Sequence, residues 1–192
     1  LYSAGSALLG YDALRGQNVP APSLPLPRDL PHNLSWDALV AEPMRYGLHA
    51  TVVAPFFPLC DKEDALTDTL SLFCKRPAAV LTPLRVVEHR GFLALMPDAA
   101  TAAGRRAQTA LRHMAGEATR VFAPLRRPAP EAELLRRAKG LTGRQLSLLR
   151  TWGYPYLFEE YDFHITLTGP STASPALCAV VAAYLADAIA QP

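Results

Sequence analysis

The pattern His-x-Thr occurs twice in this chain, each time inside a β-prone segment, and it decides how we interpret the fold. The two segments are Gly47-Leu48-His49-Ala50-Thr51-Val52-Val53 and Phe163-His164-Ile165-Thr166-Leu167-Thr168-Gly169. Side chains alternate between the two faces of a strand. We therefore expect the His and Thr of each copy to share one face, while the intervening apolar residues point toward a core.

The segments around the two copies predict alternating helices and strands. Strands are expected at about 47–54 and 160–168, and a β-hairpin at 80–88 and 92–96. Helices are expected at about 35–40, 61–77, 99–122, 131–139, 142–153 and from 174 onward, and a proline-rich loop at 16–33. Helices and a hairpin between the strands favour an α+β fold with antiparallel pairing over a doubly wound parallel sheet.

Length and composition limit the number of domains and the cellular compartment that we expect. The chain has 192 residues, half of them hydrophobic, so one domain or two small lobes can enclose a full core. The three cysteines form no C-x-x-C pattern, which favours a reducing compartment over a disulfide framework or a zinc site. We expect a cytoplasmic protein, since no signal peptide or membrane-spanning segment is visible.

Charge is unevenly spread along the sequence. Residues 101–150 hold eleven Lys and Arg against three Glu, although the formal net charge of the whole chain is only +2. Such asymmetry can steer an anionic ligand toward the protein. Alternatively, these Lys and Arg residues simply form the solvated faces of helices.

Two imidazoles and two hydroxyls around one cleft suit phosphodiester chemistry without a metal. One neutral His takes a proton from the attacking oxygen, and a protonated His gives one to the leaving oxygen. Thr hydroxyls can donate hydrogen bonds to the phosphoryl oxygens. Which of His49 and His164 is the acid depends on the direction of the reaction and stays open.

Other interpretations of these residues also stay open. Each motif His can sit on a solvated sheet face. Asp162 can join His164 as a metal ligand, but no further ligand has convincing spacing, so an orienting or purely solvated role for Asp162 is favoured. Glycine-rich phosphate-binding patterns and G-x-S-x-G are absent from the sequence. We expect the three other histidines, His32, His89 and His113, to lie on the surface.

The two motif blocks together resemble the 2H phosphoesterase superfamily. The resemblance is closer to a branch of uncharacterised proteins found with phosphonate-utilisation genes, and it covers most of the chain. The segments that carry it are Arg45-Tyr46-Gly47-Leu48-His49-Ala50-Thr51, Gly91-Phe92-Leu93-Ala94-Leu95, Leu141-Thr142 with Arg144-Gln145, Trp152-Gly153-Tyr154-Pro155-Tyr156 and Phe163-His164-Ile165-Thr166-Leu167-Thr168-Gly169-Pro170.

The resemblance implies a single bilobal α+β domain over residues 1–192, with antiparallel sheets lining a central cleft. One motif strand would lie in each lobe, lobe one at about 1–98 and lobe two at about 99–192. It also implies a strand before Tyr11 and further strands after Pro192, which we expect to be missing from the chain.

The resemblance also implies a metal-independent and cofactor-free phosphodiesterase. It would open a small cyclic phosphate, such as a phosphoribosyl cyclic phosphate in phosphonate catabolism. The partner would be a small anionic phosphodiester, with no membrane and no obligate protein partner. The implied catalytic residues are His49, Thr51, His164 and Thr166, and the implied substrate-binding residues are Arg45, Tyr46, Tyr154 and Tyr156.

Two other functions remain as alternatives. The first is an RNA 2′,3′-cyclic phosphodiesterase, for which the arginine-rich region would hold the backbone. The second is a non-catalytic protein that binds a phosphorylated metabolite.

Overall fold

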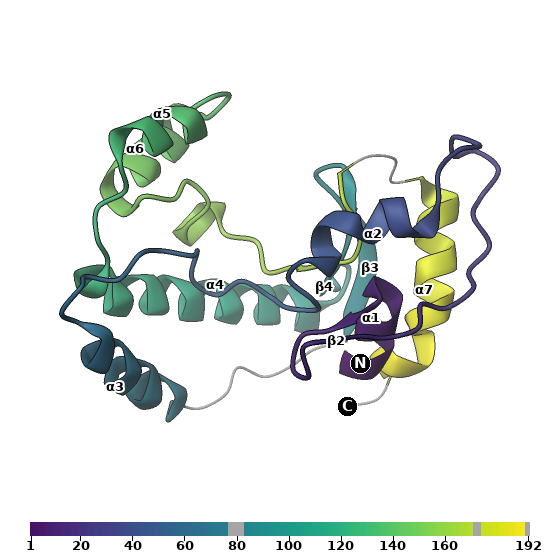
Figure 1. Cartoon of the computed structure of the whole chain (residues 1–192), viewed down its shortest axis with the longest axis horizontal. Coiled ribbons are helices and arrows are strands. Elements are labelled where there is room, and N and C mark those ends of the chain that lie inside the picture. The colour runs from purple at the N-terminus through teal and green to yellow at the C-terminus, as the bar shows by residue number, and fades with distance from the viewer. Residues whose placement is uncertain (77–82, 171–173, 191–192) are drawn as a thin grey trace. The chain divides into compact units, whose positions relative to one another are not determined.

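Two compact units make up the chain, and their segments interleave. The structure, a computed structural model, describes residues 1–76, 83–170 and 174–190 (Figure 1). The first unit consists of Leu1–Thr51, Thr82–Arg105 and His164–Pro192, and the second of Val52–Leu81 and Arg106–Phe163. These units do not follow the expected division near residue 98, and both His-x-Thr motifs belong to the first. Whether the chain forms one bilobal domain stays a prediction.

The first unit is built on a three-stranded antiparallel sheet in the order β3-β4-β5. The strands are β3 (Leu84–His89), β4 (Phe92–Pro97) and β5 (Ile165–Thr166). β3 and β4 form the predicted hairpin, with His89 opposite Phe92. Arg90 and Gly91 between them have φ angles of 51° and 88°, the geometry of a two-residue turn that matches strand twist. Residues 80–82 of the predicted hairpin lie outside the described residues.

Both predicted motif strands are much shorter than expected. Only Ala50 of 47–54 makes a β-bridge, and only Ile165–Thr166 of 160–168 is strand. Pairing stops after β5 because the carbonyl of Leu93 accepts from the N–H of both Leu167 (2.8 Å) and Thr168 (3.3 Å). The N–H of Leu93 donates to the Thr168 hydroxyl (2.9 Å) instead of to a backbone carbonyl. The prediction of two long strands was therefore wrong in extent.

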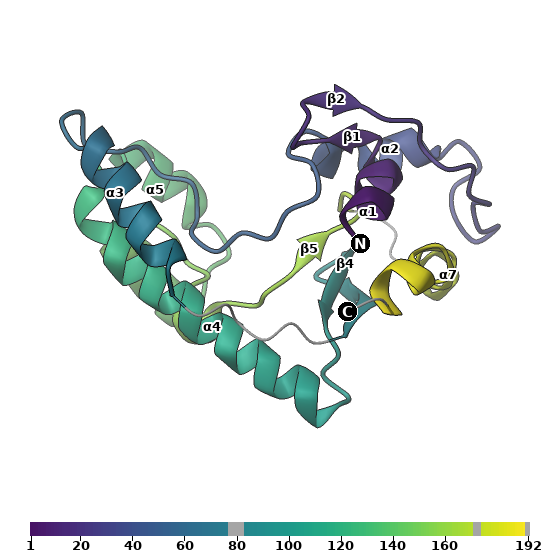
Figure 2. The ribbon, with the colours of Figure 1, turned by 90° about the horizontal axis from the view of Figure 1, so that it is seen from below.

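Three helices and a short hairpin complete the first unit. The helices are α1 (Tyr2–Leu9), α2 (Trp36–Met44) and α7 (Pro175–Ala190), and β1 (Tyr11–Asp12) pairs with β2 (Gln17–Asn18) next to α1 (Figure 2). Side chains cap the first turns of α2 and α7, since the Ser35 hydroxyl accepts from Ala38 N–H and the Ser174 hydroxyl from Leu177 N–H. Among the described residues no strand precedes Tyr11, where the chain forms α1.

One hydrophobic core lies beneath the sheet of the first unit. α7 packs against β3 (Figure 1). Apolar residues of the sheet interior, including Leu93, Leu95 and Leu167, are fully buried against this helix layer and α1. The indole N–H of Trp36 donates to the carbonyl of Leu8 at 2.9 Å, which ties α2 to α1. The opposite face of the sheet is the one that carries the motif residues.

The second unit consists of helices. They are α3 (Glu63–Cys74), most of α4 (Ala102–Phe122), η1 (Ala123–Leu125), α5 (Glu131–Arg137), α6 (Gly143–Trp152) and η2 (Phe158–Glu160). α6 begins with a capping box of Thr142 and Gln145 and ends at Gly153 in the left-handed conformation. The apolar side chains of α3 are only partly covered, since Leu70 is 52% exposed.

The α+β fold class predicted from the sequence is confirmed, with antiparallel pairing in both described sheets. In the part of the chain that the structure describes, no helix combines the length and apolar character needed to cross a membrane.

Candidate functional site: a histidine–threonine face in the first unit

The two His-x-Thr motifs pair directly with each other. Ala50, the middle residue of the first motif, forms an antiparallel bridge with Ile165, the middle residue of the second. β5 pairs on its other side with β4, where Ala94 is opposite Thr166 and Leu95 is opposite Ile165. The second motif therefore lies between the hairpin and the first motif.

This register places all four predicted catalytic residues on one face. In an antiparallel pair centred on Ala50 and Ile165, His49 is opposite Thr166 and Thr51 is opposite His164. Ile165 packs against the core, so the residues on either side of it point the other way. We call His49, Thr51, His164 and Thr166 the histidine–threonine face.

His49 is held by its own backbone turn. Its Nδ1 lies 3.0 Å from the carbonyl oxygen of Gly47, so Nδ1 carries a proton and donates it. Nε2 is then an acceptor in the neutral ring, and it lies 3.4 Å from the Thr51 hydroxyl. The exposed imidazole thus presents Nε2 outward, beside a hydroxyl of the same motif.

Leu48 fixes the first motif to the core. Its side chain fills the space over Gly5 of α1, where an added Cβ would lie 2.5 Å from Leu48 Cδ2. Gly47 itself has a φ of 71°, and a Cβ there would lie 2.5 Å from Ala13 Cβ. Glycine at both positions lets the motif approach α1 and the β1–β2 turn.

A third histidine, His89, lies beside the second motif. Its ring centroid is 5.2 Å from that of His164 and 5.4 Å from that of Phe92, and His164 and Phe92 are 5.7 Å apart. His89 was expected on the surface without a partner, and it is instead half-buried in this ring cluster. The two-residue turn is the sequence feature that could have predicted this position. It places His89 opposite Phe92, on the sheet face that carries Ala94 and Thr166.

The predicted substrate-binding residues divide between the two units. Tyr46 is 62% exposed and its ring centroid is 6.1 Å from that of His49, so it borders the face. Arg45 is exposed at the C-terminus of α2. Tyr154 and Tyr156 belong to the second unit, where their rings pack edge to face at 5.7 Å.

Asp162 pairs with an arginine of the second unit. Its Oδ1 lies 3.5 Å from an Nη atom of Arg112, whose Nε donates to the carbonyl of Tyr161 at 3.0 Å. Within the described residues, no three His, Cys, Asp or Glu side chains are grouped so that they can hold a metal ion.

Most of this chain aligns with two curated relatives. It is 37% identical over 172 residues to "Ribose 1,5-bisphosphate phosphokinase PhnN" of Janthinobacterium sp. (strain Marseille), and this covers 86% of the chain and 35% of the relative. It is 35% identical over 199 residues to the protein of the same name from Laribacter hongkongensis (strain HLHK9), covering 100% of the chain and 42% of the relative. The chain spans less than half the length of each relative. No solved structure matches the chain.

The relatives' name contradicts the predicted hydrolytic function. A phosphokinase transfers a phosphoryl group, whereas the resemblance to phosphoesterases implied the opening of a cyclic phosphate. The prediction was wrong because imidazole and hydroxyl donors fit a phosphate in many reactions. Their presence does not specify hydrolysis.

The family described as "Protein of unknown function (DUF1045)" matches residues 51–192. This match includes the second motif, the whole β3–β4 hairpin and α7, and it covers more than half of the chain. The chain therefore belongs to the DUF1045 family.

Proposed function

We propose that this chain binds phosphorylated ribose on its histidine–threonine face. It would serve as the sugar-phosphate-binding part of a protein related to ribose 1,5-bisphosphate phosphokinase. The observation that carries the proposal is the pairing of Ala50 with Ile165, which gathers two imidazoles and two hydroxyls on one face. The names of both relatives support phosphorylated ribose as the ligand class.

The donors of this face suit a phosphate monoester. Thr51 and Thr166 each offer a hydroxyl that can donate to a phosphoryl oxygen. Protonated imidazole donates from both nitrogens, and hydrogen bonds from charged donors to phosphate are about twice as strong as neutral ones. His49 directs Nε2 outward because Gly47 occupies Nδ1.

The surroundings of the face suit a small sugar. Tyr46 provides an exposed ring beside His49, and Phe92 provides a half-buried ring beside His164. Ribose 1,5-bisphosphate carries two phosphate groups. One would accept hydrogen bonds from the threonines, and the other would lie at the edge of the histidine–threonine face. The link to phosphonate catabolism implied by the sequence resemblance is part of this proposal.

Calorimetric titration of the chain with ribose 1,5-bisphosphate tests the proposal. A hydrogen bond to a charged group contributes about 1.5–3 kcal/mol. Replacing His49 with Ala should therefore weaken binding about tenfold or more. The matched control is His32→Ala, because His32 is an exposed histidine of the same unit, outside this face.

Two results would count against the proposal. The first is no saturable binding by a folded wild-type chain. The second is equal weakening by His49→Ala and His32→Ala, because the histidine–threonine face would then have no particular role.

A further inference from the structure

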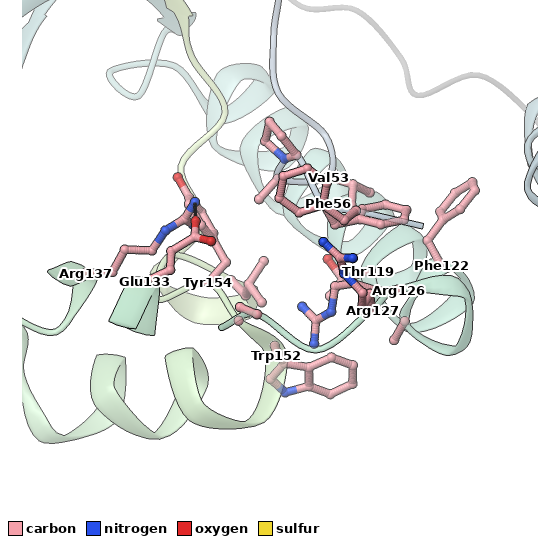
Figure 3. A pocket seen from close by; sticks show the side chains of 17 residues that line it. Val53, Phe56, Thr119, Phe122, Arg126, Arg127, Glu133, Arg137, Trp152 and Tyr154 are labelled. Atoms are coloured by element: carbon pink, nitrogen blue, oxygen red, sulfur yellow. Dashed lines mark ion pairs between the residues drawn. The ribbon is translucent and has the colours of Figure 1, made fainter. Parts of the chain in front are cut away.

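The second unit contains a cavity that no part of the proposed function uses. Its volume is about 310 Å³, at the lower end of the range for small-molecule sites. The residues that characterise its lining are Phe56, Arg126, Arg127, Glu133, Arg137 and Tyr154. We call it the arginine cavity (Figure 3).

The walls of the arginine cavity are held by backbone pairing. Leu59 N–H donates to the carbonyl of Leu125 at 2.9 Å, and Arg127 N–H donates to the carbonyl of Phe57 at 2.8 Å. Pro58 and Arg126 form an antiparallel bridge between these two bonds. The segment that supplies Phe56 is thereby fixed against the segment that supplies both arginines.

Charge in the cavity is unbalanced. Three arginines line it against one glutamate, and that glutamate is already paired, since Glu133 Oε1 lies 2.6 Å from an Nη atom of Arg137. Arg127 lies over the exposed ring of Phe57, 5.1 Å from its centroid. Among the residues that the structure describes, Arg126 has no carboxylate within ion-pair distance.

Arg126 lines the cavity, where an anion can reach it, but its guanidinium is only partly exposed to solvent. It is half-buried, and burial lowers the pKa of its guanidinium. The group lies close to Gly153, where an added Cβ would be only 3.0 Å from Nη1 and 3.4 Å from Cζ. A partly desolvated guanidinium gains most from a planar, bidentate acceptor such as phosphate or carboxylate.

The rest of the lining is apolar and aromatic. Val53, Phe56 and Phe122 contribute to it, and Figure 3 shows Phe56 near Arg126 while Tyr154 lies with Glu133 and Arg137. Such walls fit a flat ring better than a polyhydroxylated sugar.

From this geometry we propose that the arginine cavity binds a small organic phosphate carried on a flat aromatic body, as in a nucleoside monophosphate. The phosphate would accept from Arg126 and the ring would pack among Phe56 and its apolar neighbours. This site lies in the second unit and does not depend on the histidine–threonine face.

AMP is the probe for this site, with adenosine, ribose 5-phosphate and inorganic phosphate as comparisons. We expect saturable binding of AMP and at least tenfold weaker binding of each comparison. Arg126→Gln should weaken AMP binding at least tenfold, and Arg126→Lys should weaken it less because it keeps the charge without the fork. The control Arg150→Gln removes an exposed arginine of the same unit and should leave affinity unchanged.

The chain's two tryptophans report the location of binding. Trp152 lines the arginine cavity, whereas Trp36 is buried in the core of the first unit. In ¹H–¹⁵N NMR spectra, AMP should shift the indole resonance of Trp152 and leave that of Trp36 in place.

Several results would overturn this inference while leaving the proposed function to its own test. They are no saturable AMP binding, adenosine or ribose 5-phosphate binding as tightly as AMP, and equal weakening by Arg126→Gln and Arg150→Gln. Loss of AMP binding in His49→Ala would also overturn it, because the ligand would then bind in the first unit.

Discussion

A single residue, Gly47, determines the position of His49. Its carbonyl accepts from His49 Nδ1, and its left-handed φ of 71° directs the chain into the motif. No other residue fits this position well, because a Cβ would also meet Ala13.

Gly47→Ala should therefore reduce both stability and binding. The left-handed conformation alone costs about 1–2 kcal/mol for a residue with a Cβ, and the contact with Ala13 adds to that. Gly16→Ala is the matched control, because Gly16 has a φ of 64° and an added Cβ there meets nothing within 4 Å. Urea unfolding and titration with ribose 1,5-bisphosphate measure the two effects. If both variants lose affinity equally, the left-handed backbone at Gly47 does not determine the position of His49.

The Thr168 hydroxyl makes a buried hydrogen bond that ties the residues after β5 to β4. It accepts from Leu93 N–H at 2.9 Å, and Thr168 is 2% exposed. Thr168→Val keeps the shape and leaves that N–H unsatisfied, which should cost about 1–3 kcal/mol of unfolding free energy.

Thr119→Val is the comparison for this effect. Thr119 is also buried, but its hydroxyl donates to the carbonyl of Ala115, which still has its helical N–H partner after substitution. We expect the smaller loss of stability in urea unfolding for Thr119→Val. The reverse order would show that the Leu93–Thr168 bond does not hold β4 to β5.

Among the secondary-structure elements, the β1–β2 hairpin has a turn that is stabilised by Asp12. Its Oδ1 accepts from Tyr2 Oη at 2.9 Å and from Leu14 N–H at 3.0 Å, and Oδ2 lies 2.6 Å from an Nη atom of Arg15. The hydrogen bond from Arg15 is the main reason that the pKa of Asp12 lies below its ordinary value.

This lowered pKa predicts a pH dependence of stability. A carboxyl with a depressed pKa in the folded state stabilises the fold above its unfolded pKa, which is about 3.9 for Asp. That stabilisation is lost as the pH falls through the folded pKa. Between pH 6 and pH 2, urea unfolding should therefore show a larger loss of stability for the wild type than for Asp12→Asn. Asp29→Asn, an exposed control in the same unit, should behave like the wild type. Parallel pH profiles for wild type and Asp12→Asn would contradict the role of Asp12.

Elements with strong local signals were predictable from the sequence. Ser35, Ser174 and the Thr142–Gln145 box each satisfy free N–H groups within one turn, so their helices were found within a few residues. The β3–β4 hairpin was found for the same reason, because its turn is two residues long.

Long-range hydrogen bonds limited the prediction of the motif strands. Nothing in 160–168 alone shows that the Leu93 carbonyl accepts twice and ends the pairing at Thr166. The shared face of each His with its Thr was predictable from period-two alternation. The direct pairing of Ala50 with Ile165 and the neighbouring ring of His89 were not, because they depend on how segments more than seventy residues apart meet.

At the scale of the whole molecule, the chain divides into two units that interleave in sequence. Each has its own buried leucines, such as Leu177 in α7 of the first and Leu149 in α6 of the second, both 1% exposed. Membership of the 2H phosphoesterase superfamily, which implied one motif per lobe, stays a prediction.

Core truncations should act within the unit that they affect. Leu149→Ala and Leu177→Ala should each cost about 2–5 kcal/mol. By hydrogen exchange, Leu149→Ala should raise exchange mainly in residues 106–163, and Leu177→Ala mainly in the sheet and helices of the first unit. Identical patterns of increase in the two variants would show that the units open as one.

An NMR titration with ribose 1,5-bisphosphate that follows the imidazole resonances of all five histidines tests ligand binding on the histidine–threonine face. We expect the resonances of His49, His164 and the adjoining His89 to shift with ligand in one saturable process, while those of His32 and His113 do not. Shifts confined to His32 or His113, or no shift at His49 and His164 in the folded protein, would contradict this expectation.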